Sequence, residues 1–138
     1  MREDGSCGHI ACINPDTGEL EHILGGQGYS ETSSWSRGQS WILYGFALSY
    51  RHTKNKKYLD IAKKTAHYFI SNIALTGYIP LCDFRQPASA AYTDTSAGLC
   101  AACGLLEIAE HVDECEKNLY RTYAELILKH TAETCCDW

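Results

Sequence analysis

Residues 35–50 read Trp-Ser-Arg-Gly-Gln-Ser-Trp-Ile-Leu-Tyr-Gly-Phe-Ala-Leu-Ser-Tyr, and the rest of the chain is interpreted around this segment. After Trp41 only one residue is clearly hydrophilic, and an apolar run without strand-like alternation predicts a helix that is covered on all sides. The polar residues are gathered at the start of this helix. Arg37 and Trp41 stand four residues apart and therefore share one helix face. Trp35 and Gln39 form the matching pair on the neighbouring face.

The start of this helix has the features of an anion site. It carries a cation, a carboxamide and two indoles, together with the positive pole of the helix dipole and unpaired backbone N–H groups. Indole faces beside a guanidinium suit a carbohydrate with a carboxylate, because sugar C–H groups lie on aromatic rings and arginine binds carboxylates in a bidentate way. The other interpretation is a core helix in which Arg37 is tied to a structural acid while Trp35 and Trp41 only pack. The spacing alone is compatible with both.

Composition argues against several classes of function. The chain has 138 residues, enough for one modest domain, and its 17 acidic and 12 basic residues give a net charge of −5. An acidic chain is a poor partner for a phosphate backbone, so we expect no nucleic-acid binding. No uninterrupted apolar run reaches the roughly 20 residues of a membrane helix, so we expect no membrane partner. The first residues contain no apolar signal region, which favours a cytoplasmic location.

Eight cysteines are present, and two pairs of them lie close in sequence. Cys100 and Cys103 form a C-x-x-C, and Cys135 with Cys136 would complete a set of four zinc ligands. The first pair lies inside an apolar helical run, however, and the second pair is adjacent. We therefore expect free thiols and no metal. A zinc-stabilised domain is the weaker alternative.

The rest of the chain predicts a short hairpin and three more helices. Residues 6–24 form the expected β-hairpin, because Asn-Pro-Asp-Thr-Gly is a turn signal in which proline fixes φ and glycine accepts a positive φ. Ser33 or Ser34 is the expected N-cap of the first helix, and Asp94 is that of the third. The first helix should end near residues 51–53, and the others should cover about 57–72, 95–111 and 117–134.

The predicted helices alternate between two kinds. The first and third are apolar all round, whereas the second and fourth have one apolar face. Gly45 and His52 of the first are matched by Gly104 and His111 of the third, 59 residues later in each case, as expected for two copies of a helix-pair unit. Inner helices surrounded by amphipathic outer helices bury such apolar surfaces. The pattern predicts an all-α fold, either a piece of an αα-toroid or a helical-hairpin array.

Two loops carry polar residues of interest. A glycine-rich loop around Gln27 is able to pass close to a ligand, because glycine leaves the backbone uncovered. The long loop of residues 76–91 carries Asp83 and Arg85 on either side of Phe84. An acid beside an aromatic ring suits a functional role, but an ion pair that braces the loop is the favoured interpretation.

At residues 35–41, followed by a Tyr-Gly helix, the chain resembles glycoside hydrolase family 88, the unsaturated glucuronyl hydrolases. Members of that family carry a very similar Trp-Ser/Ala-Arg-Gly-Gln-Ala-Trp segment. Further matching segments lie at residues 2–6, 16–19, 27–30, 58–59 and 94–97. The resemblance implies that residues 1–138 are part of an (α/α)6 barrel, with about four helices in two helical hairpins plus the short N-terminal β-hairpin.

The resemblance also implies an activity and a set of site residues. Family 88 enzymes remove a 4,5-unsaturated uronic acid from glycosaminoglycan oligosaccharides by hydrating its enol-ether double bond, with an Asp as proton donor and without a metal or organic cofactor. The substrate-binding positions that match here are His9, Gln27, Trp35, Arg37 and Trp41. In this set the histidine and glutamine would hydrogen-bond to sugar or carboxylate oxygens, the tryptophans would stack, and the arginine would contact the substrate or orient an acid.

Departures from the family pattern limit what this chain is expected to do. Gly25 and Gly26 stand where relatives have Thr-His, and Cys82 stands where a Trp is usual. The family's catalytic Asp belongs upstream of Met1, and its last helices belong after the end of this chain. We therefore expect an internal part of the domain that binds substrate, is inactive alone and self-associates through exposed inner helices. The alternatives are an unsaturated rhamnogalacturonyl hydrolase-like part and a non-catalytic helical-hairpin interaction module.

Overall fold

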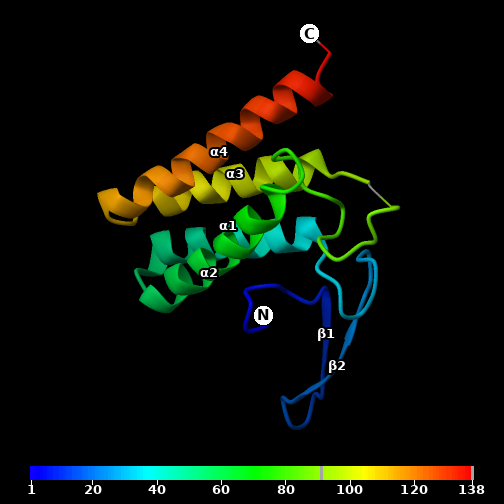
Figure 1. Cartoon of the computed structure of the whole chain (residues 1–138). Helices are drawn as coiled ribbons and strands as arrows, with labels where there is room; N and C mark the ends of the chain where they lie inside the picture. The colour runs from blue at the N-terminus through cyan, green and yellow to red at the C-terminus, as the bar shows by residue number, and fades with distance from the viewer. Residues whose placement is uncertain (91, 138) are drawn as a thin grey trace.

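The computed structural model describes residues 1–90 and 92–137, which form two helical hairpins with a β-hairpin at one end (Figure 1). The helices are α1 (Ser36–Thr53), α2 (Lys56–Ile73), α3 (Thr95–Ala109) and α4 (Glu114–Cys135). Helix α1 packs against both α2 and α3, and α3 also packs against α4. The two apolar helices are therefore neighbours, and each has an amphipathic helix beside it, as the sequence predicted.

The β-hairpin consists of β1 (Ile10–Ile13) and β2 (Leu20–Leu24), which pair in an antiparallel way. In its turn, Asn14 Oδ1 accepts hydrogen bonds from the backbone N–H groups of Asp16 and Thr17, at 2.9 and 3.0 Å. Gly18 closes the turn with a φ of +72°, a conformation that glycine adopts without strain. The hairpin points away from the helices (Figure 1). The predicted hairpin is confirmed.

The helix caps confirm one prediction and correct another. Asp94 caps α3, because its Oδ1 accepts the Ala97 N–H at 3.1 Å. Helix α1, in contrast, begins after Trp35 and has no side-chain cap, so the prediction of a serine cap was wrong. The first N–H of α1, that of Ser36, instead donates to the Cys82 carbonyl at 3.0 Å. A distant loop thus takes the place of a local cap.

The other helix boundaries differ modestly from the prediction. Helix α3 ends at Ala109, two residues early, and α4 begins at Glu114, three residues early. The first turn of α4 carries Glu116 as well as Glu114, and acidic residues there are stabilised by the helix dipole. The predicted start at residue 117 overlooked this turn because it contains no apolar periodicity.

The core lies between the four helices and is made of fully buried side chains. The largest include Leu43, Phe69, Leu105, Tyr120 and Ile127. Close approach of α1 and α3 depends on Gly104, because a Cβ there would meet Leu43 and would lie 2.9 Å from the Cα of Tyr44. One face of each apolar helix is thereby buried.

The remaining faces of α1 and α3 are not covered within the described residues. Trp41 is 54% exposed, and Leu99 and Leu106 of α3 are 42% and 41% exposed. The apolar pattern alone predicted that α1 and α3 would be covered on all sides. This prediction is not met, because α2 covers only one side of α1 and α4 covers only one side of α3. The expected exposed inner faces are therefore observed. None of the described helices is long and apolar enough to cross a membrane.

Candidate functional site

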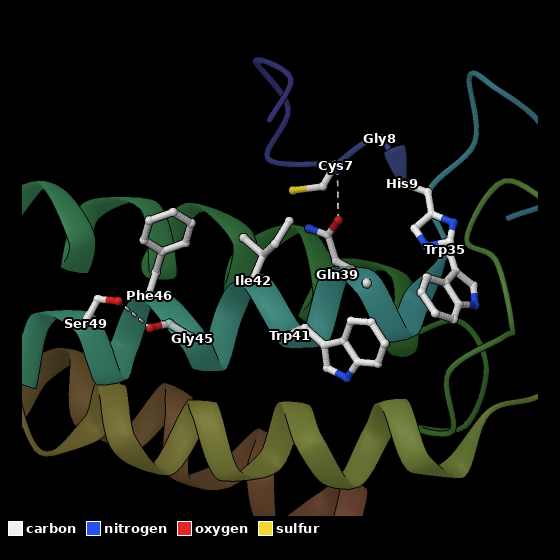
Figure 2. A pocket seen from close by; sticks show the side chains of 11 residues that line it. Cys7, Gly8, His9, Trp35, Gln39, Trp41, Ile42, Gly45, Phe46 and Ser49 are labelled. Atoms are coloured by element: carbon white, nitrogen blue, oxygen red, sulfur yellow. Dashed lines mark hydrogen bonds between the residues drawn. The ribbon is translucent and has the colours of Figure 1, made fainter. Parts of the chain in front are cut away.

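Two indoles and an imidazole form a cluster at the N-terminal end of α1 (Figure 2). Trp35, only 6% exposed, stands edge-on to Trp41, with ring centroids 5.2 Å apart and planes at 83°. His9 lies against Trp35 on another side, with ring centroids 4.4 Å apart. Trp35 is therefore the buried centre of the cluster. Trp41 offers its ring to solvent.

His9 is placed by the glycine-rich loop. His9 Nδ1 lies 2.9 Å from the backbone N–H of Gln27 and 3.1 Å from the carbonyl oxygen of Gly25, so this nitrogen is held by the loop backbone and Nε2 is the nitrogen that faces away from it. Gly26 has a φ of +55°, and a Cβ at this position would occupy the space of the His9 ring. The loop therefore needs glycine there. Its backbone orients the imidazole and leaves Nε2 on the far side of the ring.

Arg37 projects from the first turn of α1 toward the start of α3. Its Nε and Nη2 donate to Oδ2 of Asp94 at 3.0 and 2.8 Å. Its Cζ lies 5.5 Å from the centroid of the Trp35 ring, so the guanidinium and the indole are in cation–π contact. Arg37 is thus tied to an acid, as the second interpretation predicted, but Trp41 is 54% exposed and does not only pack. The Arg37 side chain nevertheless remains 41% exposed, enough to meet a ligand as well.

Asp94 is an ionised partner for this arginine. Burial by itself raises the pKa of the carboxyl, but hydrogen bonds from Ser96, from the Ala97 N–H and from Arg37 outweigh it and hold the pKa below the usual value. Asp94 is therefore a carboxylate at neutral pH. A group in that state is unsuited to donating a proton.

Gln39 does not belong to the exposed cluster, although its spacing from Trp35 predicted that it would. It is 1% exposed, and its Oε1 accepts from the Cys7 N–H at 3.0 Å and from Ser34 Oγ at 3.2 Å. Its Nε2 donates to the Gly5 carbonyl at 2.7 Å. This side chain is structural: it fastens the N-terminal segment, including the residues just before His9, to α1.

Asp83 is a buried carboxylate whose role the sequence indicated only in part. Its oxygens accept the backbone N–H groups of Tyr29 (3.0 Å), Ser34 (3.0 Å) and Arg85 (2.9 Å). The predicted ion pair between Asp83 and Arg85 is wrong, because the guanidinium of Arg85 binds Asp4 at 2.7 Å instead. Asp83 therefore braces the glycine-rich loop against the start of α1 through backbone N–H groups.

A pocket of about 490 Å³ runs from the aromatic cluster along α1 (Figure 2). The side chains that line it are mostly apolar and include Cys7, His9, Trp35, Trp41, Ile42 and Phe46. This volume falls within the range of small-molecule sites. The structure thus brings His9, Trp35, Arg37 and Trp41 to one end of α1. Gln27 joins them through its backbone, and its side chain is exposed.

The cysteines do not form a metal centre in the part of the chain that is described. Residues 1–90 and 92–137 contain no group of three or more His, Cys, Asp or Glu side chains arranged to hold an ion. All eight cysteines are free thiols. Cys100 is half-buried in α3 and Cys103 is exposed, so the C-x-x-C spacing here follows the turn of a helix.

Sequence relatives share most of this chain. It is 39% identical over 124 residues, 88% of the chain, to an unsaturated glucuronyl hydrolase of Bacillus sp. strain GL1. It is 32% identical over 136 residues, 96% of the chain, to an unsaturated chondroitin disaccharide hydrolase of Streptococcus pneumoniae. These matches cover 32% and 34% of the two relatives, so the chain spans about a third of their length. No protein-family model matches the chain.

Solved structures of unsaturated glucuronyl hydrolases also match nearly all of this chain. One described as UGL with dGlcA-Glc-Rha-Glc matches 99% of this chain with a TM-score of 0.92 and 32% identity, over 37% of its own length. The unsaturated glucuronyl hydrolase of Bacillus sp. GL1, described as responsible for the degradation of glycosaminoglycan, matches the same shares with a TM-score of 0.91 and 33% identity. These neighbours have an (α/α)6 barrel fold. The prediction that the chain is a piece of such a barrel is confirmed.

Proposed function

Because this chain belongs to the unsaturated glucuronyl hydrolase family, we propose that residues 1–138 bind the unsaturated uronic acid at the end of a glycosaminoglycan oligosaccharide. The observation that carries the proposal is the meeting of Trp35, Trp41, Arg37 and His9 at one end of α1. Aromatic faces beside a cation suit a sugar that bears a carboxylate. The pocket next to them has room for such a unit.

Each side chain has a distinct task in this proposal. Trp41, the exposed indole, stacks on the sugar, and buried Trp35 supports it from the edge. Arg37 donates to the carboxylate through Nη1, since Nε and Nη2 are already bound to Asp94. His9 hydrogen-bonds to a sugar hydroxyl through Nε2, because Nδ1 faces the Gln27 N–H and the Gly25 carbonyl. Gln27 adds its exposed carboxamide from the loop.

We further propose that the isolated chain does not catalyse the hydration. A general acid must be protonated and free to reach the substrate. Besides buried Asp83 and ionised Asp94, Glu107 is bound to Arg51 and His111, and Glu110 is bound to Arg121. These acids are all engaged with the chain itself, which supports the absence of a proton donor among them.

The arrangement also supports the proposed place of residues 1–138 in a larger (α/α)6 barrel. The uncovered faces of α1 and α3 are those that neighbouring helices of such a barrel would bury. Left uncovered, they favour self-association of the isolated chain, which we propose as its behaviour in solution. Eight free thiols are compatible with a reducing compartment, which supports the proposed cytoplasmic location.

The proposed function is tested by titrating the chain, followed by NMR, with unsaturated chondroitin disaccharide and with a neutral disaccharide that lacks the carboxylate. Saturable shifts of the Trp35 and Trp41 indole N–H signals with the acidic sugar alone are expected. Equal shifts with both sugars, or none, would contradict the proposal. Ultraviolet absorbance of the double bond, followed in the same samples, should stay constant; its steady loss would contradict the proposed inactivity.

A further inference from the structure

The carboxylate of Asp94 divides its two oxygens between separate tasks. Oδ1 accepts from Ser96 Oγ at 2.6 Å and from the Ala97 N–H at 3.1 Å, and so caps α3. Oδ2 accepts from Nε and Nη2 of Arg37 at 3.0 and 2.8 Å. The Asp94 side chain is only 6% exposed, whereas that of Arg37 is 41% exposed. One residue therefore joins the starts of α1 and α3.

The capping task alone does not require aspartate. Serine, threonine and asparagine cap helices about as well. An asparagine has a single acceptor oxygen, and because the Ala97 N–H and the guanidinium bind different oxygens of Asp94, its other terminal atom would be an NH₂ donor facing one of them. A serine hydroxyl is too short to reach from the cap to Arg37. The second oxygen is needed only for the arginine.

The contact with Asp94 restricts the guanidinium to one orientation. Asp94 Oδ2 binds the edge of the guanidinium that is formed by Nε and Nη2, while the Trp35 ring centroid lies 5.5 Å from Cζ. Among residues 1–90 and 92–137, the structure gives no hydrogen-bond partner for Nη1 of Arg37. A long side chain that would otherwise sample many rotamers is therefore held with both N–H groups of Nη1 directed away from the Asp94 contacts.

We propose that Asp94 is a positioning residue, which holds Arg37 against Trp35 so that Nη1 is presented to the carboxylate of the bound sugar. This inference rests on the proposed function and names how its key cation is oriented. It also predicts a change in ligand affinity on replacing Asp94 that is opposite to the change expected from charge repulsion alone. The Asp94 carboxylate repels an anionic ligand, so its removal would tighten binding if charge alone mattered. Positioning predicts weaker binding.

The test compares Asp94→Ser with Ser96→Ala in the 138-residue chain. The first keeps a good helix cap and releases Arg37, whereas the second removes one partner of Asp94 and leaves the arginine held. The first measurement needs no ligand: it is the solvent-exchange rate of the Arg37 Nε proton, observed by ¹⁵N NMR. The second is the affinity for unsaturated chondroitin disaccharide. Circular dichroism melts show whether both variants fold.

For Asp94→Ser we expect exchange of the Arg37 Nε proton to be about tenfold faster and the affinity to be about tenfold lower, since hydrogen bonds to charged groups have that weight. Ser96→Ala should stay within about twofold of the wild type in both. Unchanged exchange in Asp94→Ser overturns the proposal, and so does faster exchange with equal or tighter binding. If Asp94→Ser unfolds, Asp94→Asn replaces it under the same criteria. A wild-type chain that binds no disaccharide contradicts the proposed function and the presentation of Nη1, while the exchange rates still decide whether Asp94 holds Arg37.

Discussion

Gly104 of α3 packs against α1, whereas Gly45, its counterpart 59 residues earlier, is open: a Cβ there would meet no neighbouring atom within 4 Å. In a repeating helix-pair architecture, the surface at Gly45 is where the preceding inner helix would approach α1 as α3 does at Gly104. Gly104 therefore lies at a helix contact made within this chain. Gly45 lies at the surface where a neighbouring helix of the barrel would make the equivalent contact.

Alanine at these two positions should have opposite effects on stability. Gly104→Ala places a methyl group against Leu43 and Tyr44 and should lower the free energy of unfolding by about 1–3 kcal/mol. Gly45→Ala meets nothing and replaces a poor helix former, so it should raise that free energy by up to about 1 kcal/mol. Urea denaturation of both variants measures the difference. Similar losses in the two would mean that Gly45 is also packed.

Asp83→Ala should destabilise the loop around Gln27 strongly. It leaves the backbone N–H groups of Tyr29, Ser34 and Arg85 without their acceptor, and a loss of about 3 kcal/mol is expected from unsatisfied buried donors. Asp16→Ala, in the exposed hairpin turn, is the matched control and should cost less than about 0.5 kcal/mol. Thermal melts of both variants provide the comparison. A loss for Asp83→Ala as small as that for Asp16→Ala would contradict the role of Asp83 in stabilising the loop.

Tyr120 should make the protein sensitive to alkaline pH. Burial, with a smaller contribution from Glu116, raises the pKa of its hydroxyl from 10 to about 12. The folded chain therefore keeps this proton between pH 10 and 12 while the unfolded chain loses it. The stabilisation is fully present below pH 10 and is lost as the pH rises toward 12, a change of about 3 kcal/mol.

Tyr120→Phe should flatten this part of the stability curve, although it also loses the 3.0 Å hydrogen bond to His67 and so starts from a lower stability. Denaturation at several pH values between 9 and 12 gives the two slopes. Tyr29→Phe, at an exposed position, should keep the wild-type slope. Equal slopes in all three proteins would show that another group governs alkaline unfolding.

Self-association should depend on the uncovered apolar faces. Leu99 and Leu106 of α3 are exposed, and light scattering is expected to show dimers or larger species of the wild-type chain. Glutamate at both positions should shift the chain toward monomer. Leu75→Glu is the control, because Leu75 is 87% exposed but lies at the end of α2, in the turn that follows it. A wild-type monomer, or equal effects of both substitutions, would contradict this role of the faces.

Local patterns predicted most of the helices, because apolar periodicity extends through residues 57–72 and 95–109 and Asp94 is a clear cap signal. The spacing of Trp35, Arg37 and Trp41 also placed them at one helix end. Long-range partners could not be predicted. Gln39 is buried because the Gly5 carbonyl and the Cys7 N–H, over 30 residues upstream, bind its carboxamide.

The same limit applies to the two acids. Nothing in the sequence near Asp83 indicates the N–H groups of Tyr29 and Ser34, which lie about 50 residues upstream. The cap signal at Asp94 likewise hides its second partner, Arg37, on a different helix. The partners of Asp83 follow from the position of its loop against residues 29–34, and the contact of Asp94 with Arg37 follows from the packing of α1 against α3.

The most direct test of carboxylate binding at the start of α1 is the affinity of three proteins for unsaturated chondroitin disaccharide: the wild type, Arg37→Ala and Arg51→Ala. Both arginines lie on α1 and pair with an acid, but Arg51 is in its last turn and binds Glu107. Loss of a charge-assisted contact worth about 1.5–3 kcal/mol predicts at least about tenfold weaker binding for Arg37→Ala, with Arg51→Ala unchanged. Equal affinities of the wild type and Arg37→Ala would contradict a uronate site at this end of the helix.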